Sequence, residues 1–148
     1  NNKTFEKAYK LNFLDGEKVI GISLYNDYDI ISDRNIKIES DGSESGSSGG
    51  LMLSLALYDH LSNTKRDKNL IIAGTGTIDS DGNVGEIGGV KYKLLGADKN
   101  KASIFLCPKE NYKEAIKIKK KYKLKLKIVK VETFDDALNY INSLNNWL

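Results

Sequence analysis

The chain has 148 residues, 40% of them hydrophobic and 29% charged, a composition typical of one globular domain. Its formal net charge of +3 is too small to indicate a nucleic-acid-binding surface by itself. No apolar run approaches the roughly 18 residues of a membrane span, so we expect a soluble chain that does not insert into a membrane. The single cysteine, Cys107, and the single histidine, His60, exclude an internal disulfide and the usual zinc sites. We expect neither a metal nor a cofactor.

Two short strands are predicted in the N-terminal part. Val19–Leu24 and Asn35–Glu39 are rich in β-branched and apolar residues and are separated by turn residues, which favours a hairpin. The next segment, Gly49–Leu61, has the length of a helix and is apolar on most faces. We therefore expect this helix to be central and to be covered on two sides.

The rest of the chain alternates strands and helices. Leu70–Ile78 predicts a strand, and the sequence DSDGN that follows it predicts a tight turn, because its Asp-Gly pair tolerates positive φ. Further along we expect a helix at Val90–Lys99, a strand at Ser103–Cys107 stopped by Pro108, a helix at Asn111–Tyr122, a strand at Lys125–Val131, and a helix at Thr133–Leu144 with Thr133 as its N-cap. This alternation predicts an α/β fold with mixed sheets and packed helices, and residues 1–148 form one domain without a linker.

A loop rich in serine and glycine precedes the apolar helix. Ser48 lies just before the first helical turn, where unpaired N–H groups and the positive end of the helix dipole would stabilise an oxyanion. Gly46, Gly49 and Gly50 allow backbone and substrate to approach closely. A Gly/Ser loop that ends in a serine N-cap is also an ordinary structure, so the loop alone does not identify a nucleophile. His60 cannot be its base, because twelve residues of helix separate the two by roughly 18 Å.

A lysine on the helix Val90–Lys99 is the second candidate. Val90, Lys93, Leu94 and Ala97 share the spacing of a core-facing stripe, whereas Lys91 lies roughly 200° around the helix from Lys93 and is expected to face solvent. A lysine on an apolar face usually extends its charge to water. If Lys93 is instead desolvated, a neutral amine would be available to deprotonate a serine, as in a Ser/Lys dyad.

The same segments carry a family resemblance. GSSGGLMLSL resembles the nucleophile motif of Lon proteases, and AGTGTIDSDGNVGEIGGVKYKLLGADK resembles the strand, hairpin and lysine-bearing helix of that family. With IGISL and IFLCP, the resemblance covers nearly the whole chain. It is nearest to the ATP-independent, membrane-anchored bacterial branch, in which a PDZ module precedes the proteolytic domain. Ser47 replaces the usual proline, Gly49 the usual alanine, and Ser45 a frequent acidic residue.

The resemblance implies a Lon-type fold and a serine endopeptidase that acts on protein or peptide substrates through an acyl-enzyme. By position, Ser48 is the nucleophile, Lys93 the general base and then acid, and Thr75 a supporting residue whose hydroxyl bonds Lys93. The backbone of Ser47, Ser48 and Gly49 would form the oxyanion hole and the substrate approach. The chain contains no G-x-x-x-x-G-K-[ST] sequence, so we expect hydrolysis without ATP.

The resemblance also implies what lies outside the chain. Because the sequence begins with Asn1 instead of methionine, we expect a piece excised from a longer protein with an upstream PDZ module and a membrane anchor. That protein would place this domain outside the cytoplasm, a cytoplasmic location being the alternative. A homo-oligomer is compatible with the sequence, which does not specify the oligomeric state.

Two other function classes remain open at this stage. The same fold could serve as a catalytically inactive scaffold or peptide-binding domain. The basic tract KIKKKYKLKLKIVK could instead mark an RNA-binding domain. In that tract Lys123, Lys125 and Lys127 alternate with Leu124, Leu126 and Ile128, which favours a strand with one solvated face, so we expect no nucleic-acid partner.

Overall fold

The computed structural model describes residues 12–14, 17–19, 46–67 and 69–145, and its backbone forms two compact units, Asn1–Glu39 and Ser40–Leu148. In the first unit, β1 (Asn12–Leu14) and β2 (Glu17–Val19) pair as an antiparallel hairpin that the sequence analysis did not predict. The predicted strands Val19–Leu24, apart from Val19, and Asn35–Glu39 lie outside the described residues.

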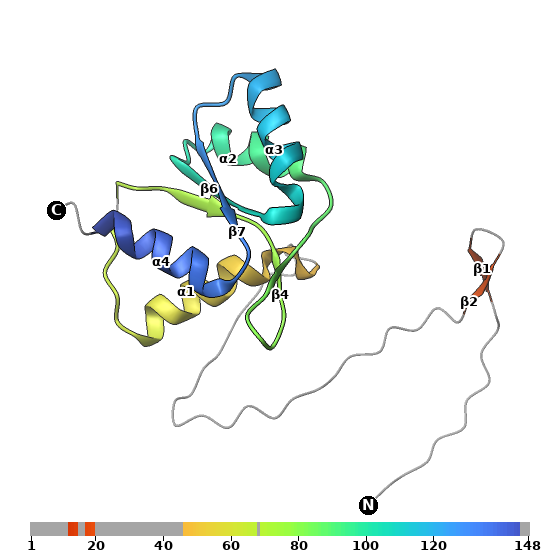
Figure 1. Cartoon of the computed structure of the whole chain (residues 1–148), viewed down its shortest axis with the longest axis horizontal. Coiled ribbons are helices and arrows are strands. Elements are labelled where there is room, and N and C mark those ends of the chain that lie inside the picture. Colours follow the sequence, from red (N-terminus) through yellow and green to blue (C-terminus); the bar gives the residue numbers. More distant parts are fainter. Residues whose placement is uncertain (1–11, 15–16, 20–45, 68, 146–148) are drawn as a thin grey trace, which may run out of the picture. The chain divides into compact units, whose positions relative to one another are not determined.

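The second unit alternates helices and strands, which confirms the predicted mixed α/β class (Figure 1). Its described elements are the 3-10 turn η1 (Ser47–Gly49), α1 (Gly50–Leu61), β3 (Ile72–Gly74), β4 (Thr77–Ile78), β5 (Val84–Gly85), α2 (Val90–Lys99), β6 (Ile104–Pro108), α3 (Lys109–Tyr122), β7 (Lys127–Val131) and α4 (Phe134–Asn145).

The central sheet of this unit is parallel, in the order β3-β6-β7. Every residue of β6 is buried, as expected for a middle strand covered on both faces. Its alternate side chains enter two separate cores: Phe105 and Cys107 join residues of α2 and α3, whereas Ile104 and Leu106 join residues of α1 and α4. The unit is therefore three-layered, with α2 and α3 on one face of the sheet and α1 and α4 on the other (Figure 1).

The predicted strand Leu70–Ile78 is in fact two strands in two different sheets. The chain still pairs with β6 at Thr75, whose N–H donates to Leu106 O at 3.1 Å. It then turns to the start of α1, because the Gly76 N–H donates to Ser48 O at 2.9 Å. Gly76 makes this crossing possible, since a Cβ there would lie 2.6 Å from Val84 Cγ1. The strand prediction was wrong because these partners are distant in sequence.

One further expectation needs correction. Pro108 does not stop β6 before itself but is the last residue of the strand, paired with Val131.

Among the described residues, α1 is covered on one side. Leu51 and Leu55 are buried with residues of the central sheet and α4, whereas Leu53 is 51% exposed and Tyr58 is 42% exposed.

The C-terminal half follows the sequence closely. Helix α2 has the predicted bounds, and the N-cap at Thr133 is confirmed by two reciprocal bonds: its Oγ1 accepts from Asp136 N, and Asp136 Oδ2 accepts from Thr133 N, both at 3.1 Å. The alternation of the basic tract also holds, since Leu124, Leu126 and Ile128 are buried and the lysines between them are exposed. Among the described residues, no helix is both long and apolar enough to cross a membrane.

Candidate active site

Ser48 lies in the 3-10 turn that leads into α1, and its backbone is fixed from the sheet side. The Ser48 carbonyl accepts two hydrogen bonds, from Gly76 N and from Thr75 Oγ1, each at 2.9 Å. The Gly76 carbonyl in turn accepts from Leu51 N at 3.1 Å. The segment that follows β3 therefore holds the start of the helix at Ser48 and again at Leu51.

The first turn of this helix lies at the positive end of its dipole. In the part of the chain that the structure describes, no acceptor outside the turn is found for the Ser48 N–H, as is usual at a helix N-terminus, whereas the Gly49 N–H lies within the 3-10 turn Ser47–Gly49. The chain enters the turn through Gly46, at φ 92°, a conformation that other residues rarely adopt. Gly50 lets β4 approach, because a Cβ there would lie 3.1 Å from Ile78 Cγ2. The backbone of Ser47, Ser48 and Gly49, predicted to form the oxyanion hole, thus lies at the positive end of the α1 dipole.

Lys93 reaches this turn from α2. The helix begins after Gly89, which has a left-handed φ of 72°, and it buries Val90, Leu94 and Ala97 in the core, as the stripe predicted. Lys93 lies beside these residues and is half-buried. Its Nζ is 3.0 Å from Ser48 Oγ. The structure therefore brings together the two residues that the sequence analysis selected as candidates, although 45 positions separate them.

Lys91 points elsewhere. Its Nζ lies 5.5 Å from the ring centroids of both Tyr92 and Tyr122. A hydrogen bond with Tyr122, together with the charges of the Tyr122 and Tyr92 hydroxyls, raises the pKa of Lys91. Lys91 is therefore a protonated partner of two tyrosines on the outer side of α2.

Thr75 is next to the pair, but its hydroxyl does not make the predicted bond to Lys93. We expected its hydroxyl to bond Lys93; it donates to the Ser48 carbonyl instead. Thr75 is 1% exposed and follows the carboxyl end of β3, the edge of a parallel sheet at which ligand sites commonly lie. Thr75 therefore orients the backbone of Ser48 and not the lysine.

Asn111 is a residue that the sequence analysis missed. It is 7% exposed, its Oδ1 accepts from Ile87 N at 2.9 Å, and its Nδ2 donates to Ile87 O at 3.0 Å. The two bonds fix the loop just before α2 and so the position from which Lys93 extends. A signal was available, because Asn111 shares the i, i+4, i+7 face of α3 with the buried Ala115 and Ile118.

Other reactive groups lie away from the pair or are inert. Helix α1 is unbroken to Leu61, so His60 stays at the opposite end from Ser48, as predicted. Burial, with a smaller contribution from Glu114, raises the pKa of the Cys107 thiol to about 12, so this cysteine is no thiolate nucleophile at neutral pH. Among the described residues, no three His, Cys, Asp or Glu side chains gather in a group able to hold a metal ion.

One family model matches most of the chain. The family model "Lon protease (S16) C-terminal proteolytic domain" matches residues 23–143. The chain belongs to the Lon protease family. The matched region is the serine-type peptidase domain of that family.

Individual Lon proteases are similar to this chain. A Lon protease of Malacoplasma penetrans is 34% identical over 108 residues, which cover 72% of this chain and 14% of the relative. A Lon protease of Campylobacter jejuni is 32% identical over 121 residues, covering 80% of this chain and 14% of the relative. A Lon protease of Clostridium beijerinckii is 39% identical over 93 residues, which cover 63% of this chain and 11% of the relative. The chain thus spans only a small part of the length of these relatives.

Proposed function

We propose that this chain is a serine endopeptidase in which Ser48 is the nucleophile and Lys93 the general base. The observation that carries the proposal is the 3.0 Å separation between Lys93 Nζ and Ser48 Oγ, which is within proton-transfer reach. The position of Ser48 at a helix N-terminus supports it, because an anionic intermediate would be stabilised by the helix dipole there. The Lon family membership supports it independently.

The first half of the reaction is acylation. A neutral Lys93 amine accepts the proton of Ser48 Oγ as this oxygen forms a bond to the scissile carbonyl carbon. The carbonyl oxygen becomes an oxyanion and accepts hydrogen bonds from the backbone N–H groups around Ser47, Ser48 and Gly49, each worth on the order of 3 kcal/mol. The carbon–nitrogen bond then breaks, the Lys93 ammonium protonates the leaving amine, and Ser48 remains as an ester.

The second half is hydrolysis of that ester. Lys93, neutral again after protonating the amine, takes a proton from a water molecule whose oxygen attacks the ester carbonyl. The same backbone donors stabilise the second oxyanion. When the bond to Ser48 Oγ breaks, Lys93 returns the proton to this oxygen, and the new carboxylic acid leaves.

We infer further that this reaction needs no ATP and that residues 1–148 act as one proteolytic domain. The absence of a P-loop sequence supports the first point. The family match supports the second, because it begins at residue 23 in the first unit and ends at residue 143 in the second. A parent protein with a PDZ module and a membrane anchor, which would place this domain outside the cytoplasm, rests on the sequence resemblance alone.

The test is hydrolysis of an unstructured protein, such as casein, by the purified chain, with and without ATP and magnesium. We expect cleavage at the same rate in both conditions, loss of cleavage in Ser48→Ala, and cleavage close to wild type in Ser47→Ala as the matched control. Strict dependence on nucleotide would contradict ATP independence. A folded wild-type chain that binds peptides but never cleaves them would favour the inactive scaffold.

A further inference from the structure

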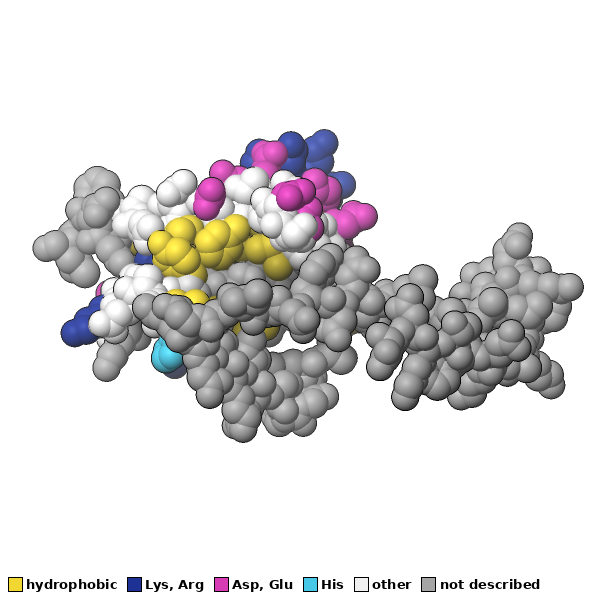
Figure 2. All heavy atoms as spheres, turned by 90° about the horizontal axis from the view of Figure 1, so that it is seen from below, with side chains coloured by type: hydrophobic (Ala, Val, Ile, Leu, Met, Phe, Trp, Pro, Cys, Tyr) yellow, Lys and Arg dark blue, Asp and Glu magenta, His cyan; other side chains and the backbone are white. Residues whose placement is uncertain are grey.

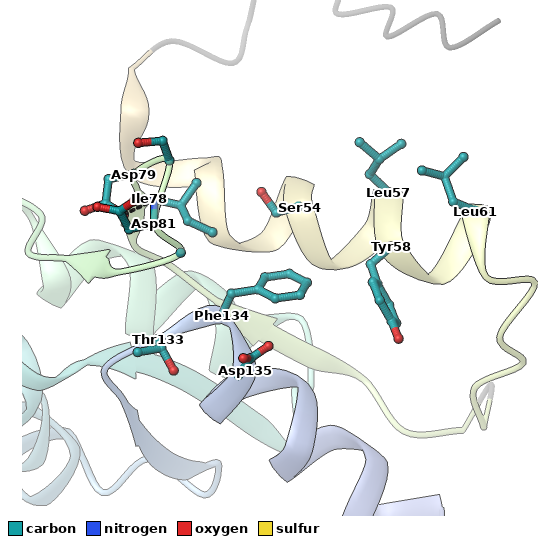
Figure 3. Close-up of a pocket in the computed structure, with 12 residues that line it drawn as sticks. Ser54, Leu57, Tyr58, Leu61, Ile78, Asp79, Asp81, Thr133, Phe134 and Asp135 are labelled. Carbon is teal, nitrogen blue, oxygen red and sulfur yellow. Dashed lines mark hydrogen bonds between the residues drawn. The ribbon is translucent and has the colours of Figure 1, made fainter. Parts of the chain in front are cut away.

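A pocket lies along α1, beyond the turn of Ser48. It has a volume of about 570 Å³ and lies between α1, the turn that joins β4 to β5, and the start of α4 (Figure 3). Its apolar lining comes from three elements: Leu57, Tyr58 and Leu61 of α1, Ile78 of β4, and Phe134 of α4. None of these residues belongs to the proposed dyad.

Two aromatic rings of the apolar lining pack against each other. Tyr58 and Phe134 lie next to each other in Figure 3, with ring centroids 5.8 Å apart and an interplanar angle of 64°, an edge-to-face pair. Figure 2 shows hydrophobic side chains exposed on one face of the molecule, with acidic side chains bordering them and His60, the chain's single histidine, on the same face. An apolar side chain of a ligand would replace water at this lining.

The rim of the pocket is acidic. Asp79, Asp81 and Asp135 line it, and Asp81 and Asp135 have no cationic partner within ion-pair distance among the described residues. Hydrogen bonds from the Asn83 side chain, and from the N–H groups of Asn83, Asp81 and Gly82, lower the pKa of Asp79, so this carboxylate is ionised at neutral pH. In a chain of net charge +3, this is a local negative site, and its complement is a cation.

We propose that this pocket binds an extended protein segment in which a large apolar residue is flanked by Lys or Arg. The apolar residue enters between Tyr58 and Ile78, and the flanking cations meet Asp81 and Asp135. Cationic and apolar groups are thus both required of the ligand, which distinguishes it from an acidic peptide and from a purely apolar one.

The position of the pocket on α1 indicates that the bound segment is part of a substrate that also reaches Ser48. This step rests on the proposed peptidase function. Helix rise places Ser54, the nearest lining residue of α1, roughly 9 Å from Ser48 along the axis, and Leu61 roughly 20 Å. An extended chain covers such distances with about three to six residues. The pocket would therefore anchor a substrate several residues away from its scissile bond and lower KM for basic-apolar sequences.

Binding is measured first without catalysis. The probe is a fluorescein-labelled peptide with one leucine between pairs of lysines, added to the full chain carrying Ser48→Ala, with fluorescence anisotropy as the readout. We expect saturable binding that weakens with added salt, and none for the same peptide with glutamates in place of the lysines. Asp81→Asn with Asp135→Asn should weaken binding roughly three- to tenfold, because exposed ion pairs are individually weak.

Matched controls separate the pocket from general charge and from the active site. Glu110→Gln with Glu114→Gln makes the same charge change on α3 and should leave binding unchanged. Leu57→Ala should weaken binding, whereas Leu53→Ala, on an exposed part of α1 outside the pocket, should not. A photoreactive phenylalanine in place of the peptide leucine should crosslink to the Ser54–Leu61 segment or to Phe134.

Several results would overturn the proposal: binding unchanged in Asp81→Asn with Asp135→Asn, equal binding of the glutamate peptide, or crosslinks confined to the segment around Ser48. If these substitutions alter the sedimentation of the chain but not peptide binding, the pocket takes a second copy of this chain and the peptide assignment is wrong. Because the binding assay uses an inactive variant, failure of the peptidase proposal leaves its outcome unaffected.

Discussion

The two segments that carry the proposed dyad are held in place by different forces. The turn of Ser48 is fixed by hydrogen bonds, since its carbonyl accepts from Thr75 and Gly76 at the edge of the central sheet. The helix of Lys93 is fixed mainly by apolar contacts, with Val90 and Leu94 fully buried beside it. The proposed nucleophile is thus oriented by directional hydrogen bonds, and the proposed base by close packing.

This difference explains why glycine is needed where the backbone crosses beside Ser48 and why apolar side chains are needed beside Lys93. Hydrogen bonding between backbones requires close approach, and Gly76 has room for no side chain beside Val84. Packing requires volume, and α2 supplies it with a stripe of apolar residues. We therefore expect substitutions near Ser48 to act through lost hydrogen bonds, and substitutions near Lys93 to act through altered packing.

The largest effect should come from removing either reacting side chain. Ser48→Ala and Lys93→Ala should each lower kcat/KM at least about a thousandfold, and the double variant should lose little more, because nucleophile and base act as a unit. Lys93→Arg should be equally inactive, since a guanidinium stays protonated. Peptide hydrolysis by folded variants, checked by circular dichroism, measures this. Lys91→Ala, the matched control, should retain most activity; if it is the inactive variant, the base is misassigned.

The next largest effect should come from removing the two hydrogen bonds by which Asn111 holds Ile87, in the loop before α2. Asn111→Leu keeps a similar volume but leaves the backbone of Ile87 without its two partners, which should cost about 1–3 kcal/mol of stability. Lys93 would then be less well placed, and kcat should fall roughly 10- to 100-fold with little change in KM. Steady-state kinetics and urea unfolding measure both, with Glu110→Gln as the neighbouring control. Lower stability with an unchanged kcat would show that Asn111 is only structural.

A smaller effect should come from removing the hydrogen bond between the Thr75 hydroxyl and the Ser48 carbonyl. Thr75→Val keeps the shape and deletes the bond to the Ser48 carbonyl, which still accepts from Gly76. Stability should fall by about 1 kcal/mol and kcat by roughly tenfold or less. Thr75→Ser, which keeps the hydroxyl, should restore most of the rate. Full activity in Thr75→Val would remove Thr75 from the site.

The smallest effect concerns Cys107, which lies in the core and outside the dyad. Native enzyme should keep its activity in iodoacetamide, because the buried thiol stays protonated until pH about 12. In the unfolded chain the thiol has its ordinary pKa of 9.0, so raising the pH above that value should favour unfolding by up to about 1.4 kcal/mol per pH unit. Urea midpoints of wild type and Cys107→Ala across this range should therefore diverge. Rapid inactivation of native enzyme by alkylation would contradict the burial of this thiol.

Ser48 and Lys93 were predictable because each has a local signal. Ser48 lies among glycines before an apolar helix, and Lys93 lies inside an apolar stripe of a helix. Their contact across 45 positions has no local signal and came only from the family resemblance. The helices of the C-terminal half were predictable for the same reason as the stripe, since amphipathic periodicity is a short-range property.

The features that were missed depend on tertiary contacts. The acceptor of the Thr75 hydroxyl, the clamp at Ile87 and the break between β3 and β4 are all set by residues far along the chain. The hairpin of β1 and β2 is a different case. The sequence holds Asp15-Gly16 between the two strands, a strong hairpin signal that the strand pattern nearby obscured.

The most direct test of the dyad is covalent labelling of Ser48 by a fluorophosphonate, because this reaction requires the activated nucleophile but no bound substrate segment. Labelling rates of wild type and folded Lys93→Arg are compared, and the modified residue is located by mass spectrometry. We predict a single labelled serine, Ser48, and labelling at least about a hundredfold slower in Lys93→Arg. Equal rates in the two proteins, or a label on Ser47 or another serine, would contradict the account.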